Sequence, residues 1–148
     1  MPSSVIKRRN AMGTRILVID DEIDMLMLLR MIIEDNTDYE VETTNNPSEA
    51  IKLLTEKDFD LIISDLKMPG MDGMELFDEI TGIQPHLPFI IITAYGSLEA
   101  SDLALKKGVS DFITKPFRKD NILFTIKRVM EFTRVKKENV ELKKKLDK

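Results

Sequence analysis

The sequence of 148 residues contains no cysteine and one histidine, His86. The absence of cysteine excludes thiol catalysis, iron–sulfur clusters, thiolate zinc sites and disulfide frameworks. A single histidine cannot by itself form a His-rich metal site or a Ser-His-Asp triad. No apolar run approaches the roughly 18 residues that a membrane-spanning helix needs, and the polar start of the chain lacks the apolar stretch of a secretory signal. We therefore expect a cytoplasmic protein without membrane contact, in which residues 1–13 are a disordered leader.

An excess of basic charge is also absent, because the net charge is −4. The chain therefore lacks the globally basic surface that nucleic-acid-binding proteins use. The charge is uneven: residues 127–148 carry nine Lys or Arg against four Asp or Glu, and the remaining 126 residues carry 13 against 22. The lysines at 136–145 have no aromatic residues between them and alternate with Glu138 and Glu141, which favours a solvated helix over direct nucleic-acid contact. The body is acidic, so the question is where its carboxylates gather.

Apolar runs are present but short, and they alternate with amphipathic segments. The runs predict strands at residues 15–20, 39–44, 60–65, 88–93 and 111–115. The amphipathic segments predict helices at residues 23–36, 49–56, 74–80, 98–107 and from 119 toward the end of the chain. This alternation is typical of a doubly wound α/β fold with a five-stranded parallel sheet, covered by helices on both faces.

Polar side chains stand at the carboxyl ends of four predicted strands. They are Asp20 and Asp21, Asp65, Thr93, and Lys115. Ligands of such sheets bind beyond the carboxyl ends of the strands, so we expect these side chains to share one site. Two carboxylates about 4 Å apart repel by about 4 kcal/mol at an effective dielectric constant of about 20. The acids must therefore take up protons or hold a cation, and an oxygen-rich site without His or Cys suits Mg²⁺.

A carboxylate can also act as a nucleophile toward a phosphoryl group, giving an acyl phosphate. Asp65 is the best candidate, because it follows the middle strand and opens a glycine-containing loop. Mg²⁺, the amine of Lys115 and the hydroxyl of Thr93 are the groups that would stabilise the phosphoryl charge. Pro116 restricts Lys115 to extended geometry, and a cis bond between them would aim the amine inward. Each residue alone would be read as a helix cap or a surface group, but their convergence favours a site.

With these residues the chain resembles the receiver domain of two-component response regulators over residues 14–128. The resemblance is carried by VIDDE at 18–22, SDLKMPGMDG at 64–73, ITAYG at 92–96 and DFITKPF at 111–117. It implies a flavodoxin-like sheet with the strand order 2-1-3-4-5, an order for which a member of this family is a standard example. It also implies that a sensor histidine kinase or a histidine phosphotransfer protein donates the phosphoryl group.

The resemblance assigns a role to each matching residue. Asp65 would be the phosphoacceptor, with Mg²⁺ bound directly by Asp21, through water by Asp20, and by the backbone carbonyl of Lys67. Thr93 and Lys115 would contact phosphoryl oxygens, and Tyr95 would be the aromatic switch that turns inward when Thr93 moves. The alternative for Tyr95 is a partly exposed aromatic residue without a switching role.

The segments GSLEA at 96–100 and KKGVSDFITKPF at 106–117 are most similar to the corresponding segments in receivers of NtrC-type transcription activators. Their receiver is followed by an ATPase domain and a DNA-binding domain, and the sequence shows neither. In the last predicted helix, Ile122, Ile126 and Val129 would cover the sheet. Residues 129–148 are predicted to form a coiled-coil extension or linker, with an a/d seam for a parallel homodimer at Phe132, Val135, Asn139, Leu142 and Leu146. The alternative is a frayed, solvated helix.

These features predict a phosphoacceptor signalling domain rather than an enzyme, with an output that is transcriptional. A stand-alone phosphorelay receiver without an output domain is an alternative. A Mg²⁺-dependent small-molecule phosphohydrolase is disfavoured, because phosphatases resembling the haloacid dehalogenase group need an Asp two residues after the nucleophile, where this chain has Lys67. A pure coiled-coil scaffold would leave the acidic constellation unexplained.

Overall fold

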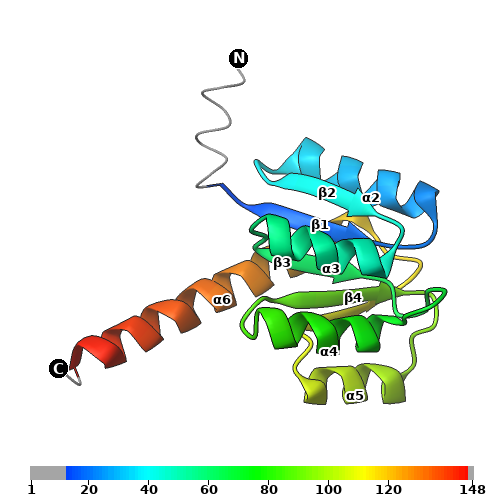
Figure 1. Cartoon of the computed structure of the whole chain (residues 1–148). Coiled ribbons are helices and arrows are strands. Elements are labelled where there is room, and N and C mark those ends of the chain that lie inside the picture. Colours follow the sequence, from blue (N-terminus) through cyan, green and yellow to red (C-terminus); the bar gives the residue numbers. More distant parts are fainter. Residues whose placement is uncertain (1–12, 147–148) are drawn as a thin grey trace.

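The computed structural model describes residues 13–146, which form an α/β domain with one long projecting helix (Figure 1). Five parallel strands make one sheet: β1 (Arg15–Ile19), β2 (Glu40–Thr44), β3 (Leu61–Ser64), β4 (Phe89–Thr93) and β5 (Asp111–Thr114). Their order is β2-β1-β3-β4-β5, which confirms the predicted order. The leader predicted at residues 1–13 lies outside the described residues except for Gly13.

Five helices connect and cover the strands: α2 (Ile23–Asn36), α3 (Pro47–Glu56), α4 (Gly73–Ile83), α5 (Leu98–Lys107) and α6 (Lys119–Leu146). Helices α2 and α6 pack on one face of the sheet, and α3, α4 and α5 pack on the other. The prediction for α4 was three residues too short at its end. Gly82 does not stop this helix, which continues to Ile83, and Pro85 follows two residues later.

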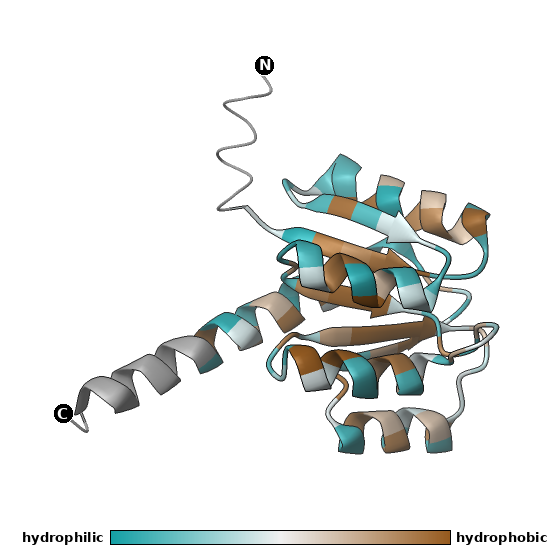
Figure 2. Ribbon diagram, viewed as in Figure 1, coloured by the Kyte–Doolittle hydropathy of each residue, from teal (hydrophilic) through white to brown (hydrophobic). Residues whose placement is uncertain are grey.

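The core consists of two apolar layers on either side of the central strands. Every residue of β3 and β4 is buried, and β1 is buried apart from its first residue. Figure 2 shows these central strands as the most hydrophobic part of the ribbon. Strands β2 and β5 lie at the edges and are only partly covered. Because helices cover both faces of the central strands, the sequence of these strands is an almost continuous run of hydrophobic residues.

The outer edge of β2 is covered by two side chains from α2. Arg30 Nη2 donates to the carbonyl oxygen of Val41 at 3.0 Å, and Glu34 Oε2 accepts the backbone N–H of Val41 at 3.1 Å. Arg30 and Glu34 also form an ion pair one turn apart, with Nε and Oε1 separated by 3.6 Å. Together they give Val41 the donor and the acceptor that a neighbouring strand would offer.

Helix α6 begins on the sheet and then leaves the body of the domain (Figure 1). Ile122, Ile126 and Val129 are buried against the sheet, as predicted. Beyond them, Phe132 is 68% exposed and Val135 45% exposed. The other predicted seam residues, Asn139, Leu142 and Leu146, have side chains outside the described set. Within the part of the chain that the structure describes, no helix is both long and apolar enough to cross a membrane.

Candidate functional site

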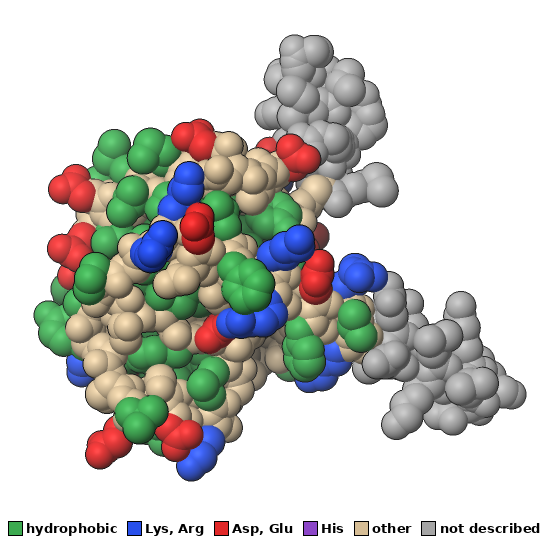
Figure 3. All heavy atoms as spheres, turned by 180° about the vertical axis from the view of Figure 1, so that it is seen from behind, with side chains coloured by type: hydrophobic (Ala, Val, Ile, Leu, Met, Phe, Trp, Pro, Cys, Tyr) green, Lys and Arg blue, Asp and Glu red, His purple; other side chains and the backbone are tan. Residues whose placement is uncertain are grey.

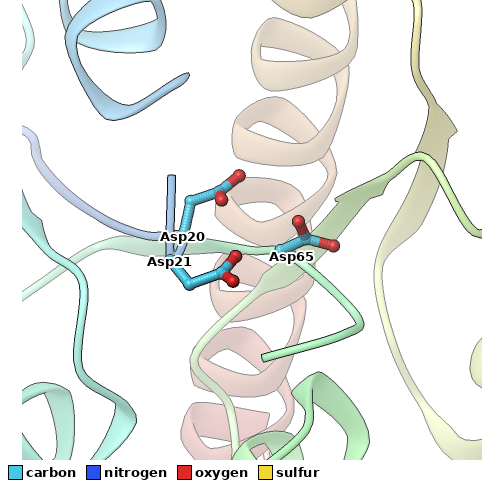
Figure 4. A group of neighbouring side chains, drawn as sticks. All are labelled: Asp20, Asp21 and Asp65. Atoms are coloured by element: carbon cyan, nitrogen blue, oxygen red, sulfur yellow. The ribbon is translucent and has the colours of Figure 1, made fainter. Parts of the chain in front are cut away.

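Three carboxylates meet at the carboxyl ends of β1 and β3. Asp20 and Asp21 follow β1 directly and Asp65 follows β3, and the pairing of these strands places their ends side by side. One oxygen of each carboxylate lies within 4.8 Å of the others, and Figure 4 shows the three neighbouring side chains. Asp20 and Asp65 are buried, whereas Asp21 is exposed. The acids that the sequence predicted to converge therefore do so, with one of them open to solvent.

Lys115 follows β5, and its ammonium group lies between two of these carboxylates. Its Nζ is 3.0 Å from Oδ2 of Asp20 and 3.1 Å from Oδ2 of Asp65, and the side chain is only 10% exposed. The Lys115–Pro116 peptide bond is cis, the isomer that the sequence analysis considered without predicting it. The amine therefore compensates part of the negative charge that the neighbouring carboxylates create.

Burial and pairing act in opposite directions on the titration of this cluster. Burial raises the pKa of Asp20 above its ordinary value, outweighing the hydrogen bonds that Asp20 accepts from the Glu22 backbone and from Lys115. Burial alone would lower the pKa of Lys115, but hydrogen bonds to Asp20 and Asp65 outweigh it and leave this pKa raised. The first direction reflects the burial of Asp20, and the second reflects the two carboxylates that flank the Lys115 amine.

The loop after β3 holds the Asp65 carboxylate through backbone groups. Asp65 Oδ1 accepts the N–H of Leu66 at 2.6 Å and the N–H of Lys67 at 3.3 Å, while Oδ2 accepts from Lys115. The residue Lys67 is exposed. The two oxygens of Asp65 are therefore held from two different elements, the β3–α4 loop and the end of β5.

Thr93 ends β4 and is fully buried. Its hydroxyl oxygen accepts the backbone N–H of Tyr95 at 3.1 Å, and its carbonyl oxygen accepts the backbone N–H of Lys115 at 2.8 Å. The Tyr95 side chain, in contrast, is 63% exposed. Thr93 thus links β4 to β5 at the site, and the tyrosine ring lies largely in solvent in this conformation.

Two residues of the site were not singled out from the sequence, although both lie inside the quoted motifs. The Glu22 backbone N–H donates to Asp20 Oδ1 at 2.9 Å, and its carboxylate is 3.8 Å from Lys115 Nζ. Gly73, the first residue of α4, packs on the backbone of the phosphoacceptor candidate: a Cβ atom there would overlap the carbonyl oxygen of Asp65 and stand 3.0 Å from the Cα of Leu66. The sequence signal was their place in the motifs, while the contacts themselves are tertiary.

A third residue that sequence analysis passed over is Phe112 on β5. It is partly buried and packs against the apolar layer beneath α3, α4 and α5. Its ring also borders the β4–α5 loop, because a Cβ atom on Gly96 would stand 3.2 Å from Phe112 Cε1. A second aromatic side chain therefore lies beside the loop that carries Tyr95.

The donor set fits a hard divalent cation. Three carboxylates lie close together, one of them exposed, and no described cluster of this kind contains a sulfur or imidazole ligand. Such an all-oxygen, solvent-open arrangement is what Mg²⁺ prefers, since this ion keeps several of its waters. With an amine and a buried hydroxyl at the neighbouring strand ends, the arrangement can bind a cation and a phosphoryl group together.

Comparison with known proteins agrees with this fold and site. A model of the response regulator receiver domain matches residues 16–127. The chain therefore belongs to the response regulator receiver domain family, a family of signalling domains of two-component systems.

Individual relatives narrow the placement. The chain is 40% identical over 116 residues to the transcriptional regulatory protein GlrR of Escherichia coli, covering 78% of this chain and 26% of GlrR. It is 35% identical over 133 residues to a putative NtrX-like response regulator of Rickettsia bellii, covering 88% of this chain and 28% of the relative. These relatives are regulators of NtrC type, which confirms the narrower resemblance seen in the sequence.

Two solved structures share the fold of this chain. The crystal structure of NtrX from Brucella abortus superimposes with a TM-score of 0.84 at 32% identity, covering 89% of this chain and 30% of NtrX. A receiver domain protein from Clostridium thermocellum superimposes with a TM-score of 0.77 at 32% identity, covering 82% of this chain and 98% of that chain. The chain spans only about a quarter of the length of the curated relatives that it matches.

Proposed function

We propose that Asp65 accepts a phosphoryl group from a phosphohistidine of a sensor histidine kinase or a histidine phosphotransfer protein. The observation that carries this proposal is the arrangement around Asp65. Its Oδ1 is held by two backbone N–H groups, and its Oδ2 lies 3.1 Å from the ammonium group of Lys115. A carboxylate oriented in this way is suited to attack phosphorus, and the fixed cation beside it is suited to stabilise the charge that spreads over the phosphoryl oxygens.

The transfer is a displacement at phosphorus. A carboxylate oxygen of Asp65 forms a bond to phosphorus while the bond between phosphorus and the histidine nitrogen breaks. The imidazole nitrogen keeps the bonding electron pair and takes up a proton. Lys115 and the hydroxyl of Thr93 are the two groups of this chain that would donate hydrogen bonds to the phosphoryl oxygens.

Asp20, Asp21, Asp65 and the backbone carbonyl of Lys67 would hold Mg²⁺. When bound, Mg²⁺ supplies positive charge that neutralises the carboxylates and the incoming phosphoryl oxygens. The support for this assignment is the cluster of three carboxylates, whose oxygens lie within 4.8 Å of one another. Asp21, the exposed member of the cluster, offers the ion its entry from solvent.

Phosphorylation by a small donor tests the proposal directly. The full chain is incubated with acetyl phosphate and Mg²⁺, and its mass is measured after acid and after base treatment. We expect one added phosphoryl group that is stable in acid and labile in base, and no addition to Asp65→Asn. The control is Asp58→Asn, which changes an exposed acid before β3 and should gain the group like the wild type. No mass gain in the wild type, or a gain that persists in Asp65→Asn, would refute the proposal.

The added charge on Asp65 would be read out through Thr93 and the β4–α5 loop. Thr93 would turn toward the phosphoryl group, and an aromatic side chain beside the loop would take up the space. Tyr95 is the candidate from the sequence, and its exposed ring is the one that would have to move inward. Phe112, partly buried beside the same loop, is the second candidate. Tyr95→Leu and Phe112→Leu separate them, because only the variant that removes the switch should lose the response of α5 to phosphorylation.

The chain would act as a signalling domain and not as an enzyme with turnover on free substrates. Lys67 stands where phosphatases resembling the haloacid dehalogenase group need an acid, and it is exposed. The only catalysis expected is self-phosphorylation and self-dephosphorylation at Asp65. As partner of a histidine kinase, the protein would work in the cytoplasm.

The output is proposed to be transcriptional, through domains of the kind that the longer relatives carry. Residues 14–128 would be the receiver and residues 129–148 a coiled-coil extension or linker. Two observations support a homodimer through α6: the helix leaves the body, and its outer face carries exposed Phe124, Phe132 and Val135. Figure 3 shows hydrophobic side chains among lysines and arginines where α6 leaves the domain. A stand-alone relay protein is the alternative, and the exposed face of α6 favours the dimeric regulator.

A further inference from the structure

The loop between β4 and α5 touches β5 at a glycine. Between Thr93, which ends β4, and Ser97, which caps α5, only three residues intervene. The last of them is Gly96, and a Cβ atom there would overlap Cγ2 of Thr114 and stand 3.2 Å from Cβ of Thr114. A side chain at position 96 would therefore push the loop away from β5.

The same loop holds the hydroxyl of Thr93. The Tyr95 backbone N–H, next to Gly96 in the chain, donates to Thr93 Oγ1 at 3.1 Å. A threonine hydroxyl that accepts this bond keeps its own proton free to donate elsewhere. On the other side of Gly96, Ser97 Oγ accepts the backbone N–H of Ala100 at 3.0 Å and caps α5. A displacement at Gly96 is therefore felt by the Thr93 hydroxyl and by the start of α5.

We propose that Gly96 is a positioning residue for phosphoryl transfer. Because Gly96 has no side chain, the β4–α5 loop can lie close against Thr114, in the place where the Tyr95 N–H orients the Thr93 hydroxyl toward the site. This inference rests on the proposed function of Asp65. The inference also separates two parts of the site. Strands β4 and β5 lie on one side of β3, whereas β1, which is followed by Asp20 and Asp21, lies on the other side. A change at Gly96 should alter the transfer and leave the binding of Mg²⁺ as it is.

The test measures phosphorylation of Gly96→Ala by acetyl phosphate in the full chain, over a range of Mg²⁺ concentrations. We expect the maximal rate at saturating Mg²⁺ to fall about threefold to tenfold, which corresponds to the net contribution of one hydrogen bond. The Mg²⁺ concentration that gives half of the maximal rate should stay unchanged. A general loss of structure would not lower the maximal rate while leaving the half-saturating Mg²⁺ concentration unchanged.

A size exchange across the contact supplies the decisive control. Thr114→Ser removes the Cγ2 methyl group at an exposed position and should by itself leave the rate unchanged. Combined with Gly96→Ala, it makes room for the new methyl group and should restore the rate to near the wild-type value. Gly82→Ala is the matched glycine control, because an added Cβ there meets no atom within 4 Å, and its rate should equal that of the wild type.

Three results would overturn the inference: an unchanged rate in Gly96→Ala, no rescue by Thr114→Ser, or a rise in the half-saturating Mg²⁺ concentration. Should Gly96→Ala fail to fold, Thr114→Ile enlarges the same contact from the β5 side, and an unchanged rate in that variant would equally overturn it. A wild-type chain that gains no phosphoryl group on Asp65 would overturn the proposed function itself. These failures are distinguishable, because only the last one affects the wild type.

Discussion

At the scale of single residues, the site is held by one ammonium group shared between two strands' carboxylates. Lys115 lies 3.0 Å from Asp20 and 3.1 Å from Asp65, with all three side chains almost fully covered. Removing Lys115 would leave two buried carboxylates without a compensating charge, and the loss of a buried partner of this kind is strongly destabilising, typically by about 3–5 kcal/mol. Lys115 therefore contributes to the folded state as well as to the proposed chemistry.

Asp20, in contrast, lowers the stability of the folded chain at neutral pH. Burial raises its pKa, so the folded chain binds the proton of this carboxyl more tightly than the unfolded chain does. The stability contribution of Asp20 therefore falls as pH rises above the ordinary pKa of an aspartate. In metal-free buffer at neutral pH, we expect Asp20→Asn to unfold at a higher temperature than the wild type, with a difference that shrinks as the pH is lowered below 4. Thermal unfolding followed by circular dichroism measures both.

Bound Mg²⁺ should reverse the order of the unfolding temperatures of the wild type and Asp20→Asn. Free Mg²⁺ at about 100 times its Kd stabilises the folded chain by about 2.7 kcal/mol, and this gain should be much smaller in Asp20→Asn. Asp58→Asn, an exposed substitution, should gain as much as the wild type. Equal gains in all three proteins would show that Asp20 takes no part in holding the ion.

The convergent residues could be predicted, and the contacts that adjust them could not. Asp20, Asp65, Thr93 and Lys115 each follow an apolar run, and parallel pairing brings the ends of such runs together whatever the details. The contacts of Gly73 with Asp65 and of Gly96 with Thr114 join residues from different elements. No local pattern encodes such approaches, so a glycine in a loop motif reads as a turn and nothing more.

At the scale of secondary-structure elements, the outer edge of β2 is a place where a second copy of the chain would pair if the edge were left open. Arg30 and Glu34 occupy the backbone groups of Val41 there. This arrangement was not predictable, because the sequence of α2 predicts a helix but not which of its charged side chains reaches a neighbouring strand. The end of α4 shows a related limit: glycine disfavours a helix interior, yet Gly82 lies inside α4, at a position where an added Cβ atom would meet no atom within 4 Å.

We expect Glu34→Ala to expose the Val41 amide. The loss of one hydrogen bond, with a net contribution of about 1 kcal/mol, should speed the exchange of this amide with solvent by about fivefold. Hydrogen exchange followed by NMR measures the rate, and light scattering at high concentration measures the accompanying self-association.

The matched control is Asp102→Ala, which removes the acid of another ion pair one helical turn apart, Asp102 with Lys106 on α5. That pair covers no strand edge, and surface pairs of this kind contribute little. Exchange at Val41 should be unchanged in this variant. A similar response in both variants would mean that the Arg30–Glu34 pair has no special role at the edge.

At the scale of the whole molecule, the proposed dimer depends on the outer face of α6. Burial of a Phe side chain contributes about 1.5–3 kcal/mol, so Phe132→Ala should weaken dimerisation by about tenfold or more. Sedimentation equilibrium of the full chain at micromolar concentration measures the dissociation constant. Leu103→Ala changes an exposed residue on α5 and should leave it unaltered. A wild-type chain that stays monomeric with and without phosphorylation would rule out the dimer.

The continuity of α6 has a geometric consequence. The helix runs from Lys119 to Leu146 without a break, and Val129 is buried on the sheet, so the body fixes the angular setting of the part that projects. Each residue of an α-helix turns it by about 100°. One residue inserted after Val129 would rotate the projecting segment by that angle about its own axis, while seven inserted residues would return it to within about 20°. The number of residues between Val129 and the projecting segment therefore determines which face of that segment points in a given direction relative to the body.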